Sequence, residues 1–286
     1  MLHYQELGNQ ELGSGVPLVV LHGLFGSGDN WRSSARVFSR KARVVLVDMP
    51  NHGMSPHTDD MRYPSMAESV RGLIEELGLG GSFVLGHSMG GKAAMALALR
   101  HPEIVRGLVV VDIAPRDYPP GHLEIIAGMQ EVATVSPSSR AEADRILARR
   151  VPNSAIRAFL LKSLVRGGDG GAAAGAGGDG GAGAGAGDGG AAAGDGGYRW
   201  ALNIDAIASC YEHLTSWPSL QGHYEGPALF IAGGRSSYVG PEDTPEIERL
   251  FPRARLESID NAGHWLHVEQ QQVFTELVLD FLAEHS

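Results

Sequence analysis

The chain has 286 residues, of which 33 are acidic and 23 are basic, so its formal net charge is -10. This length can bury a sizeable core, and it favours one α/β domain with an insertion over two equal domains. Because Lys and Arg are scattered rather than gathered into a basic stripe, the composition excludes nucleic acid as an expected partner.

The single cysteine, Cys210, rules out an internal disulfide and is interpreted as a core residue. No apolar run reaches the length of about 18 residues that a membrane-spanning helix needs. Residues 2–7 already have a strand-like pattern, so we expect no signal or transit peptide. These features favour the cytoplasm. A mitochondrial or plastid protein that had lost its transit peptide would have the same pattern.

Short apolar runs alternate with segments of helical length along most of the chain. This alternation predicts an α/β fold with a mostly parallel, doubly wound sheet. The expected strands are 16–21, 43–48, 83–87, 107–112, 228–232 and 254–259. The expected helices are 30–39, 65–77 and 92–100 between strands, and 271–284 after the last strand.

Residues 115–224 break this rhythm, because they contain no strand-like run. They predict a helical cap inserted between two parts of the core, 1–114 and 225–286, and we expect this cap to shape the pocket above the carboxyl ends of the strands. The expected cap helices are 122–132, 138–150, 152–165 and 204–214.

Within the cap, residues 167–197 are made only of Gly, Ala and Asp. Such a tract cannot bury enough apolar surface to offset its ordering entropy, so we expect a disordered loop. Glycine-rich calcium-binding repeats carry a large apolar residue in each repeat, and this tract has none, so a calcium site is not expected.

The nucleophile is predicted from residues 86–90, which form a Gly-x-Ser-x-Gly sequence between an apolar strand and an alanine-rich helix. Such a turn forces its central residue into a strained conformation that lifts the side chain above the sheet edge. The pattern therefore predicts Ser88 as a catalytic nucleophile on a nucleophile elbow. The alternative is a purely structural glycine-rich turn.

A serine hydroxyl needs a base, and we expect His264, on the loop between the last strand and the final helix. The third member of the triad, the acid that orients the histidine, is harder to predict, because several residues could supply it. The loop after the expected strand 228–232 carries serine at position 236, and Asp243 follows seven residues later. Asp112 ends the strand beside the elbow and is the favoured acid, whereas Asp205 also satisfies the chain order Ser, Asp, His.

The oxyanion hole needs two backbone N–H donors. We expect one from Met89, directly after the nucleophile, and one from Leu24 in the glycine-rich loop after the first buried strand. His87 is expected to pack behind the elbow, although its neighbourhood also makes it a candidate pocket residue. The full set of expected pocket residues is Phe25, His87, Tyr118, Tyr238 and Trp265.

Taken together, these motifs resemble the α/β-hydrolase superfamily, and within it the serine esterase branch of the bacterial YbfF-type esterases and the eukaryotic α/β-hydrolase domain-containing protein 11. Many members of the superfamily carry the triad aspartate in the loop after the strand 228–232, and the resemblance to this branch includes the serine that stands there at position 236. It implies an esterase or thioesterase for short to medium acyl chains, with no metal or organic cofactor and a small-molecule substrate. The motifs that carry it are 22–27, 48–55, 86–92, 111–115 and 261–265.

Two other functions fit the same sequence. A cofactor-free haloperoxidase or a carbon–carbon bond hydrolase would keep this triad. A ligand-binding or scaffold protein could keep the pocket without turnover, because fold alone does not set function.

Overall fold

A computed structural model describes residues 1–8, 16–167 and 197–286. The tract predicted to be disordered at 167–197 lies almost entirely outside these ranges, so its disorder stays a prediction. The described chain forms two compact units, Met1–Gly121 with Leu202–Ser286, and His122–Ala201. The second unit is shorter than the 115–224 segment predicted as a cap, because residues 115–121 and 202–224 belong to the first unit. The role of 115–224 as a cap stays a prediction.

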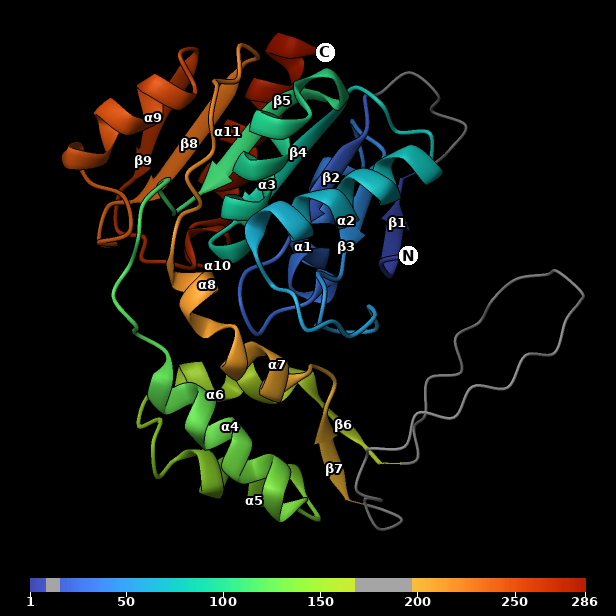
Figure 1. Ribbon diagram of the computed structural model, residues 1–286, viewed down its shortest axis with the longest axis vertical. Coiled ribbons are helices and arrows are strands. Elements are labelled where there is room, and N and C mark those ends of the chain that lie inside the picture. Colours follow the sequence, from blue (N-terminus) through green and yellow to red (C-terminus); the bar gives the residue numbers. More distant parts are fainter. Residues whose placement is uncertain (9–15, 168–196) are drawn as a thin grey trace, which may run out of the picture. The chain divides into compact units, whose positions relative to one another are not determined.

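The first unit is built on a seven-stranded sheet in the order β1-β3-β2-β4-β5-β8-β9. All neighbouring strands are parallel except β1, which runs antiparallel to β3 (Figure 1). The mostly parallel sheet predicted from the sequence is therefore confirmed. The strands are β1 (Tyr4–Leu7), β2 (Leu18–Leu21), β3 (Val44–Val47), β4 (Ser82–His87), β5 (Val105–Val111), β8 (Ala228–Gly233) and β9 (Ala254–Ile259).

Helices cover both faces of this sheet, which explains why β2, β3 and β4 are buried along their whole length. Helices α2 and α3 pack together on one face, and α1 and α11 pack together on the other (Figure 1). The helices of the first unit are α1 (Arg32–Phe38), α2 (Tyr63–Glu76), α3 (Met89–Arg100), α7 (Ile204–Ser209), α8 (Tyr211–Thr215), α9 (Thr244–Leu250), α10 (Leu266–Glu269) and α11 (Gln271–His285).

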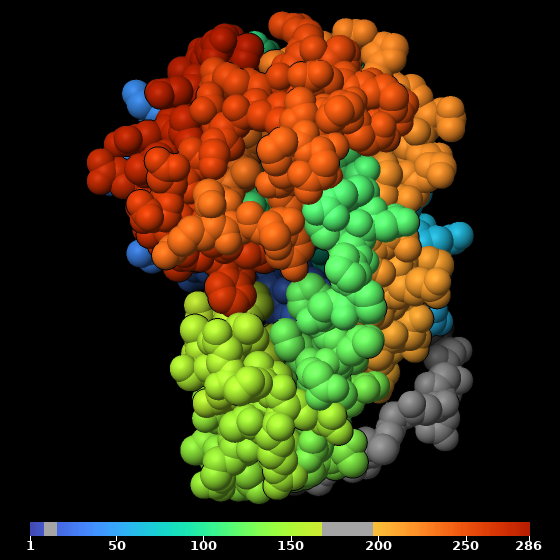
Figure 2. Space-filling model, turned by 90° about the vertical axis from the view of Figure 1, so that its left-hand side faces the viewer, coloured from blue at the N-terminus to red at the C-terminus, as the bar shows by residue number. Residues whose placement is uncertain are grey.

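Aromatic side chains fill the core between the sheet and α1 and α11. Trp31, Phe38 and Phe274 are buried there with the apolar side chains of β2, β3 and β5. On the face drawn in Figure 2, the surface of the first unit comes mainly from the C-terminal part of the chain, coloured orange to red.

The second unit is mainly helical, and its described elements are α4 (Leu123–Val135), α5 (Arg140–Leu147), α6 (Ser154–Leu160), the short 3-10 helix η4 (Leu161–Ser163), β6 (Leu164–Arg166) and β7 (Tyr198–Trp200). The expectation that 115–224 contains no strand is wrong, because β6 and β7 form a two-stranded antiparallel ladder. These three-residue strands meet across the Gly/Ala/Asp tract, so no local alternation of apolar and polar residues announces them.

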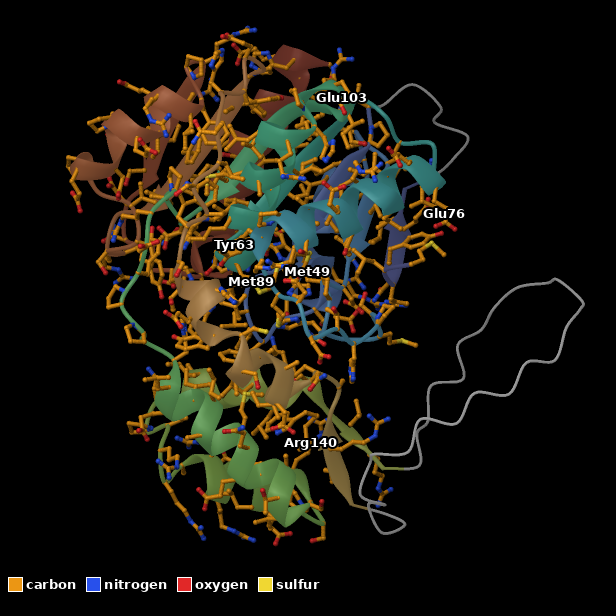
Figure 3. The ribbon with its side chains drawn as sticks, in the orientation of Figure 1. Met49, Tyr63, Glu76, Met89, Glu103 and Arg140 are labelled. Atoms are coloured by element: carbon orange, nitrogen blue, oxygen red, sulfur yellow. The ribbon has the colours of Figure 1, made fainter. Side chains whose placement is uncertain are left out.

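The carboxyl ends of the parallel strands lie together at one edge of the sheet. Met49 follows β3 and Met89 follows β4, and both lie at the same end of the first unit, whereas Glu76 and Glu103 lie at the opposite end (Figure 3). Ligands of α/β sheets bind at the carboxyl edge, so the candidate site is built there.

Candidate active site

Ser88 joins the end of β4 to the start of α3 in a strained conformation, with φ 53° and ψ -117°. The turn is so tight that a Cβ on Gly86 would lie 2.2 Å from the Gly90 carbonyl oxygen, and a Cβ on Gly90 would lie 2.4 Å from the Leu21 carbonyl oxygen. The glycines flanking the serine are therefore required by space. The Ser88 amide donates to the Val111 carbonyl at 3.1 Å, which ties the elbow to β5.

Left-handed backbone is concentrated at this edge of the sheet. Non-glycine residues in that region carry a conformational cost and collect at functional sites. Those that follow a strand of the large sheet have φ between 50° and 64° and are Phe25, Asn51, Ser88, Asp112 and Asn261.

Asp112 and His264 form a close pair, with 2.7 Å between Asp112 Oδ2 and His264 Nδ1. The Asp112 side chain is fully buried, whereas that of His264 is 23% exposed. A carboxylate in this position fixes the imidazole tautomer in which Nδ1 carries the proton and Nε2 can accept one.

Two further donors hold the Asp112 carboxylate. The Gly233 amide donates to Oδ1 at 2.9 Å, and the Ser236 hydroxyl donates to Oδ2 at 2.5 Å. Ser236, noted in the sequence as the residue that replaces an expected aspartate, thus binds the aspartate on the neighbouring strand. The sequence identified the substitution but carried no signal for this contact.

The other aspartates lie elsewhere. Asp205 is exposed in the first turn of α7, where an acidic side chain favours the helix dipole. Asp243 is buried and pairs with Arg116, with 2.7 Å between its Oδ1 and Arg116 Nε. Of these candidate acids, it is Asp112 that the fold brings to His264.

The loop that carries His264 is fastened to His87, the residue beside Ser88. His87 Nε2 donates to the His264 carbonyl at 2.9 Å, and the two ring centroids are 4.7 Å apart. His87 is only 4% exposed, so it supports the loop from within the core, the first of the two positions considered for it. Ser88 is half-buried and follows directly in the chain.

A second buried histidine extends this support. His267 stacks on Trp31 with ring centroids 4.3 Å apart, and its ring lies 4.8 Å from that of His87. Burial lowers the pKa of His267 to about 3 and holds the pKa of His87 well below its usual range. Both rings are therefore neutral at physiological pH.

These buried histidines predict a loss of stability in acid. An unfolded histidine titrates near pH 6.5, so between pH 6.5 and about pH 3 the unfolded chain binds more protons than the folded chain. The free energy of unfolding is highest above this window and falls as the pH is lowered through it. Urea denaturation at a series of pH values measures the slope, and His267→Phe should reduce it by up to about 1.4 kcal/mol per pH unit. The same slope in His267→Phe as in wild type would contradict the assignment of His267 as a buried histidine with a lowered pKa.

The two amides expected to form the oxyanion hole are open. In the described parts of the chain, no acceptor takes a hydrogen bond from the amide of Leu24 or of Met89. Phe25, the residue after Leu24, donates its amide to His52 Nε2 at 3.2 Å instead. An open amide at the head of α3 and another after β2 suit the stabilisation of a developing oxyanion.

Aromatic side chains flank the candidate base. The Tyr238 ring stacks on His264, with centroids 4.0 Å apart and planes inclined by 20°. Tyr118 donates its hydroxyl to the Tyr238 carbonyl at 2.5 Å and accepts a hydrogen bond from the Ala114 amide at 2.8 Å. Among the other expected pocket residues, Phe25 is buried and Trp265 is half-buried.

Sequence reasoning missed the role of Lys92, four residues after Ser88. Its ammonium group is buried and donates to the carbonyls of Thr215 and Ser216 at 3.0 and 2.9 Å. The Tyr118 ring faces it at 4.8 Å. Burial lowers the pKa of Lys92 to about 7. These contacts hold together the segments that enter and leave residues 122–201 in the chain, and no local pattern predicts them.

The variant Ser236→Ala tests the importance of the hydrogen bond from the Ser236 hydroxyl to the Asp112 carboxylate. Without that hydroxyl the carboxylate can turn away from His264, so we expect kcat for ester hydrolysis to fall by about three- to thirtyfold, with KM little changed. The exposed neighbour Ser237→Ala is the control and should keep the wild-type kcat. Equal rates for the two variants would contradict this role.

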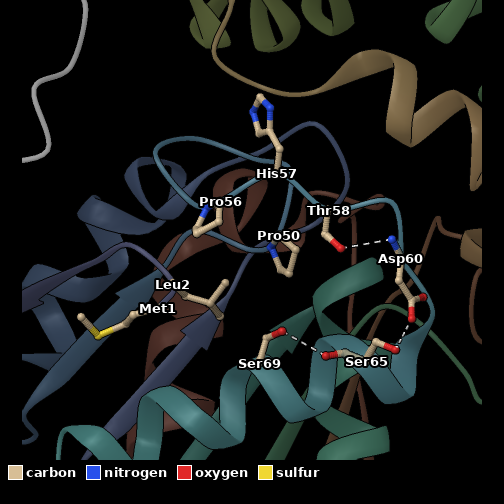
Figure 4. A pocket seen from close by; sticks show the side chains of 9 residues that line it. All are labelled: Met1, Leu2, Pro50, Pro56, His57, Thr58, Asp60, Ser65 and Ser69. Atoms are coloured by element: carbon tan, nitrogen blue, oxygen red, sulfur yellow. Dashed lines mark hydrogen bonds between the residues drawn. The ribbon is translucent and has the colours of Figure 1, made fainter. Parts of the chain in front are cut away.

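A pocket of about 380 Å³ beside α2 is lined by residues other than Ser88, Asp112 and His264 (Figure 4). Its hydroxyl groups bond within the pocket wall: Ser65 donates to Asp60 at 2.6 Å and Ser69 donates to the Ser65 carbonyl at 3.0 Å. We assign it no catalytic part. Its lining residues are Met1, Leu2, Pro50, Pro56, His57, Thr58, Asp60, Ser65 and Ser69.

Comparison with known proteins identifies the family. Residues 16–142 match the family described as alpha/beta hydrolase fold. The sn-1-specific diacylglycerol lipase ABHD11 of Mus musculus is 40% identical, and the alignment covers 93% of this chain and 80% of that protein. The chain belongs to the α/β-hydrolase family.

Other relatives of this α/β-hydrolase are named esterases. Esterase YbfF of Escherichia coli (strain K12) is 32% identical over 94% of the chain and 93% of its own length. The solved structure of a marine microorganism esterase is 37% identical, covers 98% of both chains and superposes with a TM-score of 0.85. These matches confirm the expected branch and the expected class of activity, ester hydrolysis.

The same matches imply a small-molecule ester as the substrate. Within residues 1–8, 16–167 and 197–286, no helix is long and apolar enough to span a bilayer. The compartment in which this α/β-hydrolase works stays a prediction.

Proposed function

We propose that this ester hydrolase works through an acyl-enzyme on Ser88, with His264 as the general base and acid and Asp112 as the carboxylate that orients it. The observation that carries the proposal is the 2.7 Å contact between Asp112 and His264, on the loop that His87 fastens to the elbow. This arrangement supplies a nucleophile, a base and an orienting acid at one sheet edge.

In acylation, the Ser88 oxygen attacks the ester carbonyl while its proton passes to His264 Nε2. Asp112 stabilises the resulting imidazolium, and the amides of Leu24 and Met89 bind the tetrahedral oxyanion. When the intermediate collapses, the bond to the alcohol oxygen breaks and His264 returns the proton to that oxygen. Water then attacks the acyl-enzyme by the same steps, which releases the carboxylic acid and restores Ser88.

The substrates proposed are esters of short to medium acyl chains, with thioesters as a related class. Relatives named esterase and diacylglycerol lipase support carboxylic esters with an alcohol leaving group. Steady-state hydrolysis of p-nitrophenyl esters from acetate to laurate, with a diacylglycerol as a further substrate, measures the preference. We expect kcat/KM to peak at a short or medium chain. Turnover of none of these esters by folded protein would contradict the proposal.

Acyl transfer to an alcohol is a second candidate, because a relative from Saccharomyces cerevisiae (strain ATCC 204508 / S288c), 32% identical to this chain, is named probable alcohol acetyltransferase. An alcohol can replace water as the group that attacks the acyl-enzyme. Two acetate esters with different leaving groups, hydrolysed in the presence of ethanol, should give the same ratio of ethyl acetate to acetate if both pass through one acyl-enzyme. Different ratios would exclude that common intermediate.

A further inference from the structure

The loop that holds Leu24 contains a tight turn with a non-glycine residue, Phe25, at a position of positive φ. The Gly26 amide donates to the Gly23 carbonyl at 3.0 Å, and Phe25, the third residue of this turn, has a φ of 64°. Leu24 is not among the residues with positive φ, so the turn is of type II. Its third position favours glycine, because a side chain is strained there. A phenylalanine at this position therefore needs a contact that keeps its backbone at positive φ.

His52, on the loop after β3, supplies that contact. Its Nε2 accepts the Phe25 amide at 3.2 Å, while its Nδ1 lies 2.9 Å from the Pro50 carbonyl. A carbonyl can only accept, so Nδ1 carries the proton and Nε2 is free to accept. The ring is fully buried, and burial lowers the pKa of His52 to about 3. It therefore keeps its acceptor throughout the neutral pH range.

The same two loops are joined by a second, reciprocal contact. The Met49 amide donates to His22 Nε2 at 2.9 Å, and His22 Nδ1 lies 2.8 Å from the Gly23 carbonyl. The rings of His22 and His52 meet edge to face with centroids 5.1 Å apart. Each loop thus contributes one histidine acceptor to an amide of the other, and the pair fixes their spacing.

We propose that His52 is a positioning residue for the oxyanion hole, which holds the Leu24–Phe25 peptide so that the neighbouring Leu24 amide stays open toward the substrate. Types I and II turns differ by rotation of this central peptide. If the Phe25 amide loses its acceptor, the strain at Phe25 favours rotation of this peptide to the type I form. In that form the Leu24 carbonyl points where the Phe25 amide pointed before. That rotation would shift the Leu24 backbone and weaken oxyanion binding. The proposal rests on the proposed function.

A matched pair of substitutions tests this role. Gln places an amide oxygen where His52 Nε2 lies, whereas Asn reaches only as far as Nδ1 and can still bind the Pro50 carbonyl. With the best p-nitrophenyl ester, His52→Asn should lower kcat by about ten- to a hundredfold with KM within about threefold, because the loss falls on the transition state. His52→Gln should stay within about fivefold of wild type. The control is His57→Asn, on an exposed residue of the same loop, with unchanged kcat.

Inhibition by a trifluoromethyl ketone separates positioning from a general loss of structure. This probe forms a tetrahedral oxyanion on the nucleophile, so its inhibition constant should rise in His52→Asn by about the same factor as kcat/KM falls. The pH profile of kcat should keep its acid limb, because His52 is not the base. Equal rates for the Asn and Gln variants, or an unchanged inhibition constant, would overturn the proposal.

Removing the strain supplies a third test. Glycine adopts a φ of 64° without cost, so a Phe25→Gly background should no longer need the acceptor. In that background His52→Asn should change kcat by less than about threefold. The full effect persisting in Phe25→Gly would overturn the proposal. If the wild-type enzyme itself hydrolysed no ester, the proposed function would be wrong. Comparison of these variants tests only the positioning role of His52.

Discussion

Replacing Ser88 with alanine is expected to lower kcat/KM for ester hydrolysis by about four to six orders of magnitude, because the attacking oxygen is removed. The fold should be retained, since Ser88 is half-buried and the glycines that shape the elbow are unchanged. Hydrolysis of a p-nitrophenyl ester and thermal unfolding measure the two effects.

The control for this substitution is Ser209→Ala, at an exposed serine in α7 that should keep full activity. Ser88→Gly should be equally inactive and more stable than wild type by about 0.5–1 kcal/mol, because glycine tolerates the φ of 53°. Ester hydrolysis by Ser88→Ala within tenfold of wild type would refute the nucleophile.

Asp112→Asn is expected to lower kcat by about three to four orders of magnitude. The amide nitrogen of asparagine would face His264 Nδ1 and favour the tautomer in which Nε2 carries the proton and cannot act as a base. The backbone should be kept, because asparagine tolerates the φ of 50° at this position as well as aspartate does. Steady-state kinetics with the preferred ester measures the effect.

Asp205→Asn and Asp243→Asn are the matched controls for the acid. Asp205 is exposed on α7, so its variant should keep the wild-type kcat. Asp243 pairs with Arg116, so its variant should be less stable than wild type but should keep the wild-type kcat. A loss of several orders of magnitude in Asp205→Asn, with Asp112→Asn active, would show that the acid assignment is wrong.

The sequence predicted the sheet and the candidate site because both depend on local patterns placed in chain order. A Gly-x-Ser-x-Gly turn between a strand and a helix locates Ser88, and parallel strands bring their carboxyl ends to one edge. His264 could be predicted because it lies on the loop after the last strand. Asp112 could be predicted because it ends the strand beside the elbow, although the usual position of the acid carries Ser236.

Contacts between distant segments could not be predicted in this way. The hydrogen bond from Ser236 to Asp112 joins residues 124 positions apart, and that from Lys92 to Thr215 joins residues 123 positions apart. The amide of Phe25 meets His52 because two loops converge in space. The strands β6 and β7 were missed because each has three residues and its partner lies across a long tract.

Intact-protein mass spectrometry after exposure to a fluorophosphonate tests the central claim most directly. The reagent phosphonylates a serine only when a base and an oxyanion hole activate it. We expect one adduct on wild-type protein, none on Ser88→Ala, and much slower labelling of Asp112→Asn. An adduct that persists in Ser88→Ala, or folded wild-type protein that takes no label, would contradict the account of Ser88 as the activated nucleophile.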